Sequence, residues 1–182
     1  SKKSNIEKDE SFIKTYTISS SKRQKRENKI NLIEKSLEKS RLHLSKGEIE
    51  KASYYYQIMI DNGYKKAEVF FNYAVISQKL NKTNKAIELY KESIVIDPQF
   101  TSSYINLARL KINQNNFDEA LSILHNVIKI APDFADPYFL LGNIYYLNEN
   151  YEKASNNYQL AIKKNPKNNQ YKQSFIKLLT FF

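Results

Sequence analysis

Residues 116–166 read NFDEALSILHNVIKIAPDFADPYFLLGNIYYLNENYEKASNNYQLAIKKNP, and the order of small, apolar and proline residues in this stretch recurs after 34 positions. This interval, called the repeat period, separates Ala120 from Ala154 and Pro132 from Pro166. Three series of similar residues follow the same interval: Ala52, Ala86, Ala120 and Ala154; Tyr56, Tyr90, Leu124 and Tyr158; Ala74, Ala108 and Gly142. Repetition at this period is typical of a solenoid of stacked helical units.

Each unit divides into two halves that carry helical periodicity. In the third unit, apolar residues follow one another at steps of three and four: Phe117, Ala120, Leu121, Leu124, Val127 and Ile128. Polar turns separate the halves, and they read SKGE, NKTN, NQNN and NENY. The pattern predicts helix pairs in residues 33–66, 67–100, 101–134 and 135–168, followed by one capping helix in residues 169–182. Ser45 and Asn116 each precede a glutamate by three positions, which predicts a capping box at both.

Glycine and alanine at fixed places indicate where paired helices approach most closely. Gly142 and Ala154 occupy such places in the fourth unit, and a large side chain there would overpack the contact. The aromatic residues beside them fill the remaining space and bury a large area each.

The pattern resembles the tetratricopeptide repeat family over about 136 of the 182 residues. The residues that carry the resemblance in the last two units are Tyr104, Leu107, Ala108, Ala120, Leu124, Val127 and Pro132, then Tyr138, Leu141, Gly142, Ala154, Tyr158, Ala161 and Pro166. The first unit departs from it, with Ser36 at the aromatic position and Tyr64 at the closing proline. The resemblance implies an all-α, right-handed α-solenoid of antiparallel helix pairs that spans residues 27–182, with a ligand groove along the first helix of each pair.

Residues 1–26 differ from the repeats, because they hold 8 basic and 3 acidic residues and lack the repeat pattern. We expect a basic, flexible N-terminal segment. An alternative is that residues 11–19, SFIKTYTIS, add a strand to a partner or lie extended in the protein's own groove. The basic run KRQKR, residues 22–26, is a candidate contact for an anionic surface.

Composition narrows the function classes. The chain has a net charge of +10, but only 4 of its 29 basic residues are arginine, and its many lysine, asparagine, isoleucine and tyrosine residues are typical of AT-rich coding. A nucleic-acid partner is therefore not expected. The absence of cysteine excludes disulfides and thiolate sites. No apolar run reaches the roughly 18–20 residues of a membrane span, and we expect a cytoplasmic protein that does not span a membrane.

The residues give no pattern of a catalytic or metal site. His43 and His125 fall in different units without metal-ligand spacing, and the three glycines form no phosphate loop. Asp133 and Asp136 flank the boundary between two units, where Asp136 is placed to cap the next helix. We expect no enzyme activity, catalytic residue, metal or cofactor.

A helical stripe on the first helix of each unit predicts the groove wall. Its residues are Leu37, Arg41, Phe71, Asn72, Val75, Ile105, Asn106, Arg109, Phe139, Asn143 and Tyr146. Asn72 and Asn106 are equivalent, and asparagine amides can hold a peptide backbone; the same asparagines also fit the coding bias. Similar asparagines occur in the arrays of O-linked N-acetylglucosamine transferases.

The leading hypothesis is a non-catalytic scaffold for a protein or peptide partner, and the alternative is a substrate-presenting module of a longer transferase. Self-association through the N-terminal segment or the C-terminal helix is a third hypothesis.

Overall fold

The structure is a computed structural model that describes the backbone of residues 2–180 and the side chains of residues 20–180. Over that part of the chain it contains helices and no strand. The helices are α1 (Lys2–Ser45), α2 (Ile49–Asp61), α3 (Ala67–Lys79), α4 (Thr83–Ile96), α5 (Thr101–Asn113), α6 (Phe117–Ile130), α7 (Ala135–Leu147), α8 (Tyr151–Lys164) and α9 (Asn169–Leu179). They form two compact units, one of which ends at Tyr64 while the other begins at Lys65.

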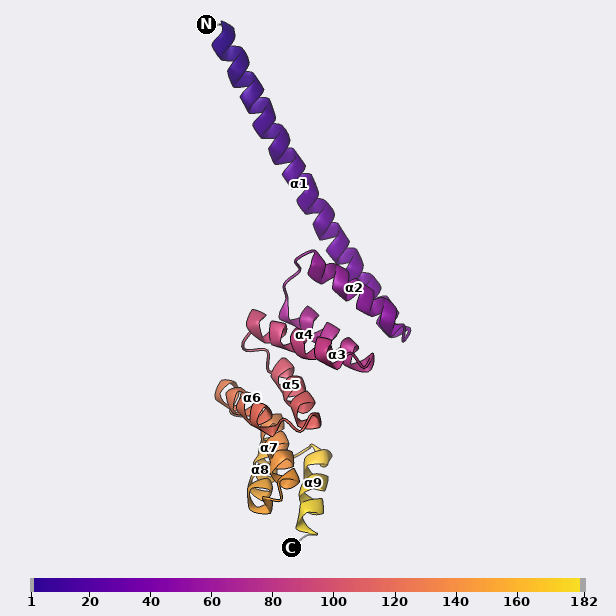
Figure 1. The fold of residues 1–182 in the computed structure, drawn as a ribbon, viewed down its shortest axis with the longest axis vertical. Helices are drawn as coiled ribbons and strands as arrows, with labels where there is room; N and C mark the ends of the chain where they lie inside the picture. The colour runs from indigo at the N-terminus through magenta and orange to yellow at the C-terminus, as the bar shows by residue number, and fades with distance from the viewer. Residues whose placement is uncertain (1, 181–182) are drawn as a thin grey trace. The chain divides into compact units, whose positions relative to one another are not determined.

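The first unit consists of α1 and α2, which pack side by side as an antiparallel pair (Figure 1). Ser36 and Ser40 of α1 are buried, and each hydroxyl is satisfied because it donates to a carbonyl of the preceding turn, at 2.7 Å and 2.8 Å. Residues 11–19 are helical and belong to α1, so they do not form the extended segment considered above. The flexibility expected of residues 1–26, and the boundary after residue 26, stay predictions.

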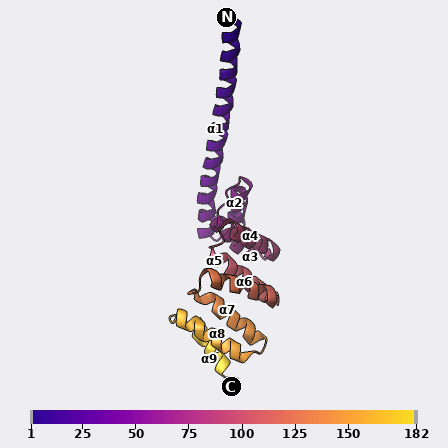
Figure 2. The same ribbon diagram turned by 90° about the vertical axis from the view of Figure 1, so that its left-hand side faces the viewer.

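The second unit stacks the pairs α3–α4, α5–α6 and α7–α8 in chain order, and α9 packs on α8 (Figures 1 and 2). Its helices match the expected repeats, which confirms the all-α solenoid. The small residues at the predicted contacts are fully buried: Ala74, Ala86, Ala108, Ala120 and Ala154. None of the described helices combines the length and the apolar character that crossing a membrane requires.

The turn inside each helix pair has the same backbone geometry. Gly47, Asn81, Asn115 and Glu149 follow one another at the repeat period, and all have positive φ, between 57° and 73°. In the α3–α4 turn, the amide of Lys82 donates to the carbonyl of Ser77 at 2.8 Å, as in a helix end closed by a left-handed residue. A left-handed residue at each of these turns therefore reverses the chain once per repeat.

At one of the two predicted capping boxes the cap is present, although the glutamate there bonds the side chain of the capping residue and not its backbone amide. Asn116 caps α6, since its Oδ1 accepts from the Glu119 amide at 3.3 Å and its Nδ2 donates to the Glu119 carboxylate at 3.0 Å. Ser45 does not cap α2, so that prediction is wrong. It is the last residue of α1, and its hydroxyl donates back to the Leu42 carbonyl at 2.8 Å. The residue before α2 is Glu48, whose side chain makes no capping bond.

Equivalent tyrosines tie the first helix of a pair to the loop before it. The hydroxyl of Tyr104 donates to the carbonyl of Pro98 at 3.2 Å, and that of Tyr138 donates to the carbonyl of Pro132 at 3.0 Å. Because these bonds recur at the repeat period, they fix how each of these two helices enters the stack.

Candidate functional site: the A-helix face of the second unit

The first helices of the pairs, α3, α5 and α7, are called the A helices, and their shared stripe of predicted groove residues is called the A-helix face. Seven predicted residues on it are half-buried: Phe71, Asn72, Val75, Asn106, Arg109, Asn143 and Tyr146. Helix α9 also contributes to this face, because it takes the place of the first helix of a fifth pair: its Lys177 follows Asn143 of α7 by one repeat period. Partial exposure is what a surface that binds a partner requires.

Ile105 and Phe139 do not belong to this exposed set, so the prediction that they face the groove is wrong. Their exposed fractions are 4% and 2%. Phe139 stacks on Tyr171 of α9 with ring centroids 4.8 Å apart. Phe139 is therefore covered by α9, whereas Phe71, at the same repeat position two periods earlier, is half-buried, and spacing along a single helix does not reveal this difference.

Leu37 and Arg41 lie on α1 in the first unit, where Leu37 is half-buried and Arg41 is exposed. The candidate site consists of residues of the second unit.

Tyr90 of α4 links two A helices beneath the face. Its hydroxyl donates to Oε1 of Gln78 on α3 and accepts from Nδ2 of Asn106 on α5, the latter at 3.1 Å. Burial raises the pKa of Tyr90 to about 12, and the bond from Asn106 acts in the opposite direction. The Nδ2 group of Asn106 is therefore used inside the protein. The Oδ1 atom of Asn106 has no partner among the side chains that the structure describes.

Tyr158 of α8 makes the corresponding link in the last pair. Its hydroxyl donates to Oδ1 of Asn143 at 2.8 Å, and burial raises the pKa of Tyr158 to about 12. The Asn143 side chain is thereby oriented, and within the described residues its Nδ2 has no acceptor. Asn106 thus retains an acceptor and Asn143 a donor, both fixed by a tyrosine and available to a peptide backbone.

A pocket of about 290 Å³ lies at the end of the face where α9 meets the last pair. Its lining residues are Ile112, Asn143, Tyr146, Leu147, Tyr158, Ser174 and Lys177. The Lys177 ammonium lies 5.9 Å from the centre of the Tyr146 ring, within the range of a cation–π contact. The pocket offers an apolar wall, an amide, a hydroxyl and a positive charge, which suits a side chain with an apolar body and a polar or acidic end.

Leu147, Ser174 and Lys177 line the pocket but do not belong to the predicted groove residues. Extending the repeat period into α9 would have found two of them, since Ser174 follows Asn106 by two periods and Lys177 follows Arg109 by two periods. The roles expected for residues 169–182 are to cap the last repeat and, as an alternative, to mediate self-association.

Arg109 takes part in a network that joins three helices. Its guanidinium lies 3.7 Å from the carboxylate of Asp136, which also accepts a hydrogen bond from the hydroxyl of buried Tyr171. Burial raises the pKa of Tyr171, and the Asp136 carboxylate raises it further. Asp136 is therefore not the predicted N-cap. It lies in the first turn of α7, whose N-cap is Phe134, and it fastens α9 to the stack.

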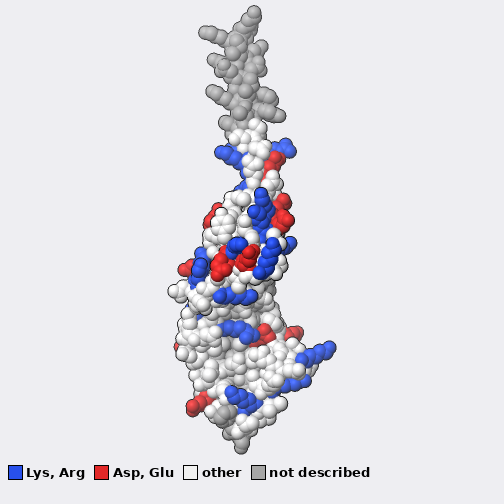
Figure 3. All heavy atoms as spheres, turned by 90° about the vertical axis from the view of Figure 1, so that its right-hand side faces the viewer, with Lys and Arg blue, Asp and Glu red and all other residues white. Residues whose placement is uncertain are grey.

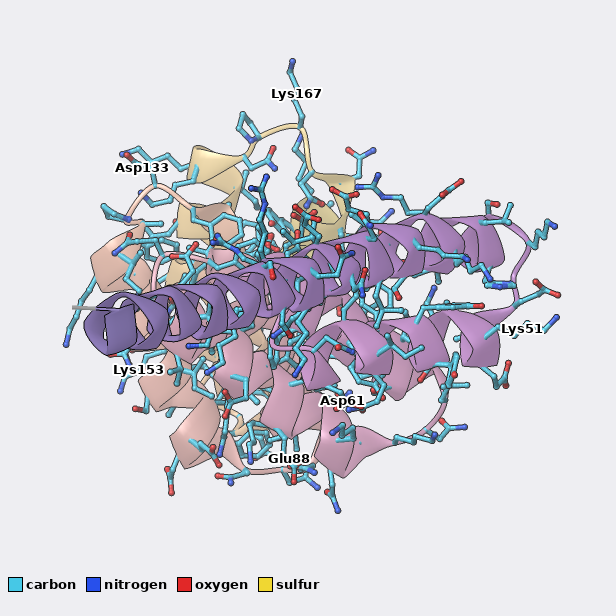
Figure 4. All side chains as sticks on the ribbon, turned by 90° about the horizontal axis from the view of Figure 1, so that it is seen from above. Lys51, Asp61, Glu88, Asp133, Lys153 and Lys167 are labelled. Carbon is cyan, nitrogen blue, oxygen red and sulfur yellow. The ribbon has the colours of Figure 1, made fainter. Side chains whose placement is uncertain are left out.

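The polar residues considered for chemistry do not converge. The imidazole Nδ1 of His43 lies 2.6 Å from the carboxylate of Glu48, whereas His125 is exposed on α6. Asp133 has a fully exposed side chain that pairs with Lys164 at 3.1 Å, and it lies at the outer edge in Figure 4. Over the residues that the structure describes, no group of three or more His, Cys, Asp or Glu side chains is arranged to hold a metal ion.

Comparison with solved structures shows the same fold in other proteins. MamA from Desulfovibrio magneticus RS-1 is 20% identical, with a TM-score of 0.71 over 81% of this chain and 83% of that chain. YrrB, described as a TPR protein with an unusual peptide-binding site, is 21% identical, with a TM-score of 0.66 over 74% of this chain and 70% of that one. The first TPR domain of Spaghetti, bound to an HSP90 peptide, is 20% identical, with a TM-score of 0.58 over 63% of this chain and 91% of that one.

No curated protein matches the sequence of this chain. The family model described as tetratricopeptide repeat matches residues 79–133 and 114–174, which together span more than half of the chain. Together with the repeated turns, the buried small residues and the stacked pairs, these matches place the chain in the tetratricopeptide repeat family.

Proposed function

We propose that the second unit is a non-catalytic scaffold that binds a segment of a partner protein along its A-helix face. The observation that carries the proposal is the pocket between the last pair and α9, which joins Tyr146, Leu147 and Lys177 in one concave site. Binding pockets combine an apolar wall with a few placed polar groups in this way. A peptide in the structure of Spaghetti, and the peptide-binding site named for YrrB, support a peptide as the ligand.

The fixed amides support an extended peptide backbone as the element recognised along the face. Asn106 and Asn143 keep one amide group each for a ligand, while their tyrosine partners hold the other. A ligand then loses little entropy in ordering these side chains, which favours affinity. Phe71 and Val75, both half-buried, add apolar contact area at the other end. The substrate-presenting role in a longer transferase stays a prediction.

The test selects peptides for the full chain from a random displayed library and measures their affinity by calorimetry. The double substitution Tyr146→Ala and Lys177→Ala removes two pocket walls, and we expect the affinity of the selected peptides to fall roughly tenfold or more. Helicity measured by circular dichroism should remain, since both side chains are partly or fully exposed.

The matched control is Leu160→Ala with Lys163→Ala on α8, which removes an exposed apolar side chain and a lysine away from the pocket. Peptide affinity should be unchanged in this control. If the control loses affinity while the pocket variant keeps it, the partner binds α8, the second helix of the last pair, and the proposal is wrong.

A further inference from the structure

The first part of α1 whose side chains are described is exposed on all sides. Every residue from Ser20 to Leu32 is exposed, and burial against α2 begins further along the helix. This stretch contains five basic residues and one acidic residue. Figure 3 shows Lys and Arg side chains projecting there, next to the grey atoms. The repeat fold does not need this charge, because no other helix of the unit buries these side chains.

Four of the basic residues share one face of the helix. The first of them is Lys22, and the others follow it by three, four and seven positions, a spacing that aligns side chains along an α-helix: Lys25, Arg26 and Lys29. We call these four residues the basic stripe. None of them pairs with an acidic side chain among those described, whereas neighbouring Arg23 pairs with Glu27 at 3.2 Å. The charge of the stripe is therefore available to a partner.

Two exposed apolar side chains border the stripe. Ile30 is 45% exposed and lies one helical turn after Arg26, and Leu32 is 41% exposed and lies one turn after Lys29. Ile30 and Leu32 lie on opposite sides of the stripe and form no apolar face, so the basic residues would provide most of the attraction to anionic headgroups and the two apolar side chains would add limited contact at its edges.

We propose that the basic stripe, with Ile30 and Leu32, binds the surface of a bilayer that contains anionic phospholipids. Three of the four stripe residues are lysine, which acts as a point charge, whereas arginine is favoured for bidentate phosphate contacts in nucleic-acid recognition. The exposed apolar neighbours add contacts that a headgroup layer accommodates. This surface lies in the first unit, so it does not depend on peptide binding by the second.

The test is cosedimentation of the full chain with vesicles of phosphatidylcholine alone or of phosphatidylcholine mixed with phosphatidylserine. We expect binding to the mixed vesicles only, and weaker binding as salt increases. Replacing Lys22, Lys25, Arg26 and Lys29 by glutamine should weaken binding roughly 1,000-fold, since each charge near an anionic surface contributes about 1 kcal/mol. Replacing Ile30 and Leu32 by serine should weaken it about tenfold. Circular dichroism should show that both variants retain their helices.

The matched control replaces exposed Lys129, Lys163, Lys167 and Lys172 by glutamine, which removes the same total charge from the second unit. Binding within a few-fold of the original supports the stripe. An equal loss in the control would show an effect of net charge alone and overturn the proposal. Equal binding to both vesicle types, or tighter binding to a single-stranded RNA homopolymer than to mixed vesicles at the same salt, would also overturn it.

Discussion

A β-carbon on Gly142 would stand 2.5 Å from the ring of Tyr158, closer than two carbon atoms can approach without a shift. The glycine lets this ring cross α7, so that the Tyr158 hydroxyl donates to Oδ1 of Asn143, the next residue along the helix. In the second repeat the equivalent pair is Ala74 and Tyr90, and there the hydroxyl reaches Gln78, one helical turn beyond the alanine. The tyrosine at this repeat position therefore bonds to different residues in the two repeats. Where it crosses a glycine it donates to the next residue, and where it crosses an alanine it donates to a residue one turn further along.

Gly142→Ala should lower the free energy of unfolding by about 1 kcal/mol. Overpacking against the ring costs roughly 1–3 kcal/mol, and the higher helix propensity of alanine offsets about 1 kcal/mol of it. Urea denaturation followed by circular dichroism measures the change. The same substitution in a Tyr158→Leu background should be neutral or stabilising, because Ala108 and Leu124 form this combination in the third repeat. Equal destabilisation in both backgrounds would contradict the steric explanation.

Glu149→Gly should raise the free energy of unfolding by about 1 kcal/mol. Glu149 has a φ of 57°, which costs a residue with a side chain energy that glycine avoids. Gly47→Ala is the reverse experiment, because Gly47 has a φ of 73° and open space around it, and it should destabilise by a similar amount. Chemical denaturation of both variants tests the sign. No change in either would show that the turns relax around the new residue.

The sequence was sufficient for the repeats because each recurring position performs one physical task. Ala86, Ala120 and Ala154 occupy the closest helix contacts, and a larger residue at any of them would separate a pair. The period therefore predicted the helix pairs, their turns and the capping helix. Even Gly142, the single glycine in the series, was placed correctly at a close contact.

The exposure of the A-helix face was only partly predictable, because it depends on contacts between repeats. Ile105 and Asn106 are adjacent in sequence, yet one is buried under the next helix and the other remains half-exposed. Helical spacing identifies a face but not how far the following repeat covers it. The tyrosine bonds that orient Asn106 and Asn143 join residues 15 or 16 positions apart, and no periodic pattern marks them.

The stability of the first unit should fall as the pH is lowered from about 4.5 toward 2. Hydrogen bonds from Lys51 and His43 lower the pKa of Glu48 to about 2. A carboxylate with a depressed folded pKa contributes stability above its unfolded pKa and loses it as the pH falls through the folded value. Glu48→Gln should flatten the dependence of the melting temperature on pH in this range. Glu50→Gln, at an exposed neighbouring glutamate, is the control and should leave the profile unchanged. A profile that is the same in all three proteins would contradict the assignment.

Tyrosine ionisation should destabilise the second unit at high pH. Burial raises the pKa of both Tyr90 and Tyr158 from 10 to about 12, so the folded state disfavours the phenolate. Stability from these groups is complete below pH 10, the unfolded value, and is lost as the pH rises through about 12. Tyr158→Phe should cost about 1 kcal/mol at neutral pH, since Asn143 loses its hydrogen bond, and should reduce the loss of stability above pH 10.

Denaturation at a series of pH values, with phenolate absorbance recorded in parallel, measures both effects. Tyr54→Phe serves as the control, because Tyr54 is 63% exposed and belongs to the first unit. If Tyr158→Phe and Tyr54→Phe show the same alkaline profile, the buried hydroxyl does not govern the transition. If only the Tyr158 variant becomes less sensitive to high pH, the bond that orients the Asn143 side chain also limits the pH range in which the last repeat stays folded.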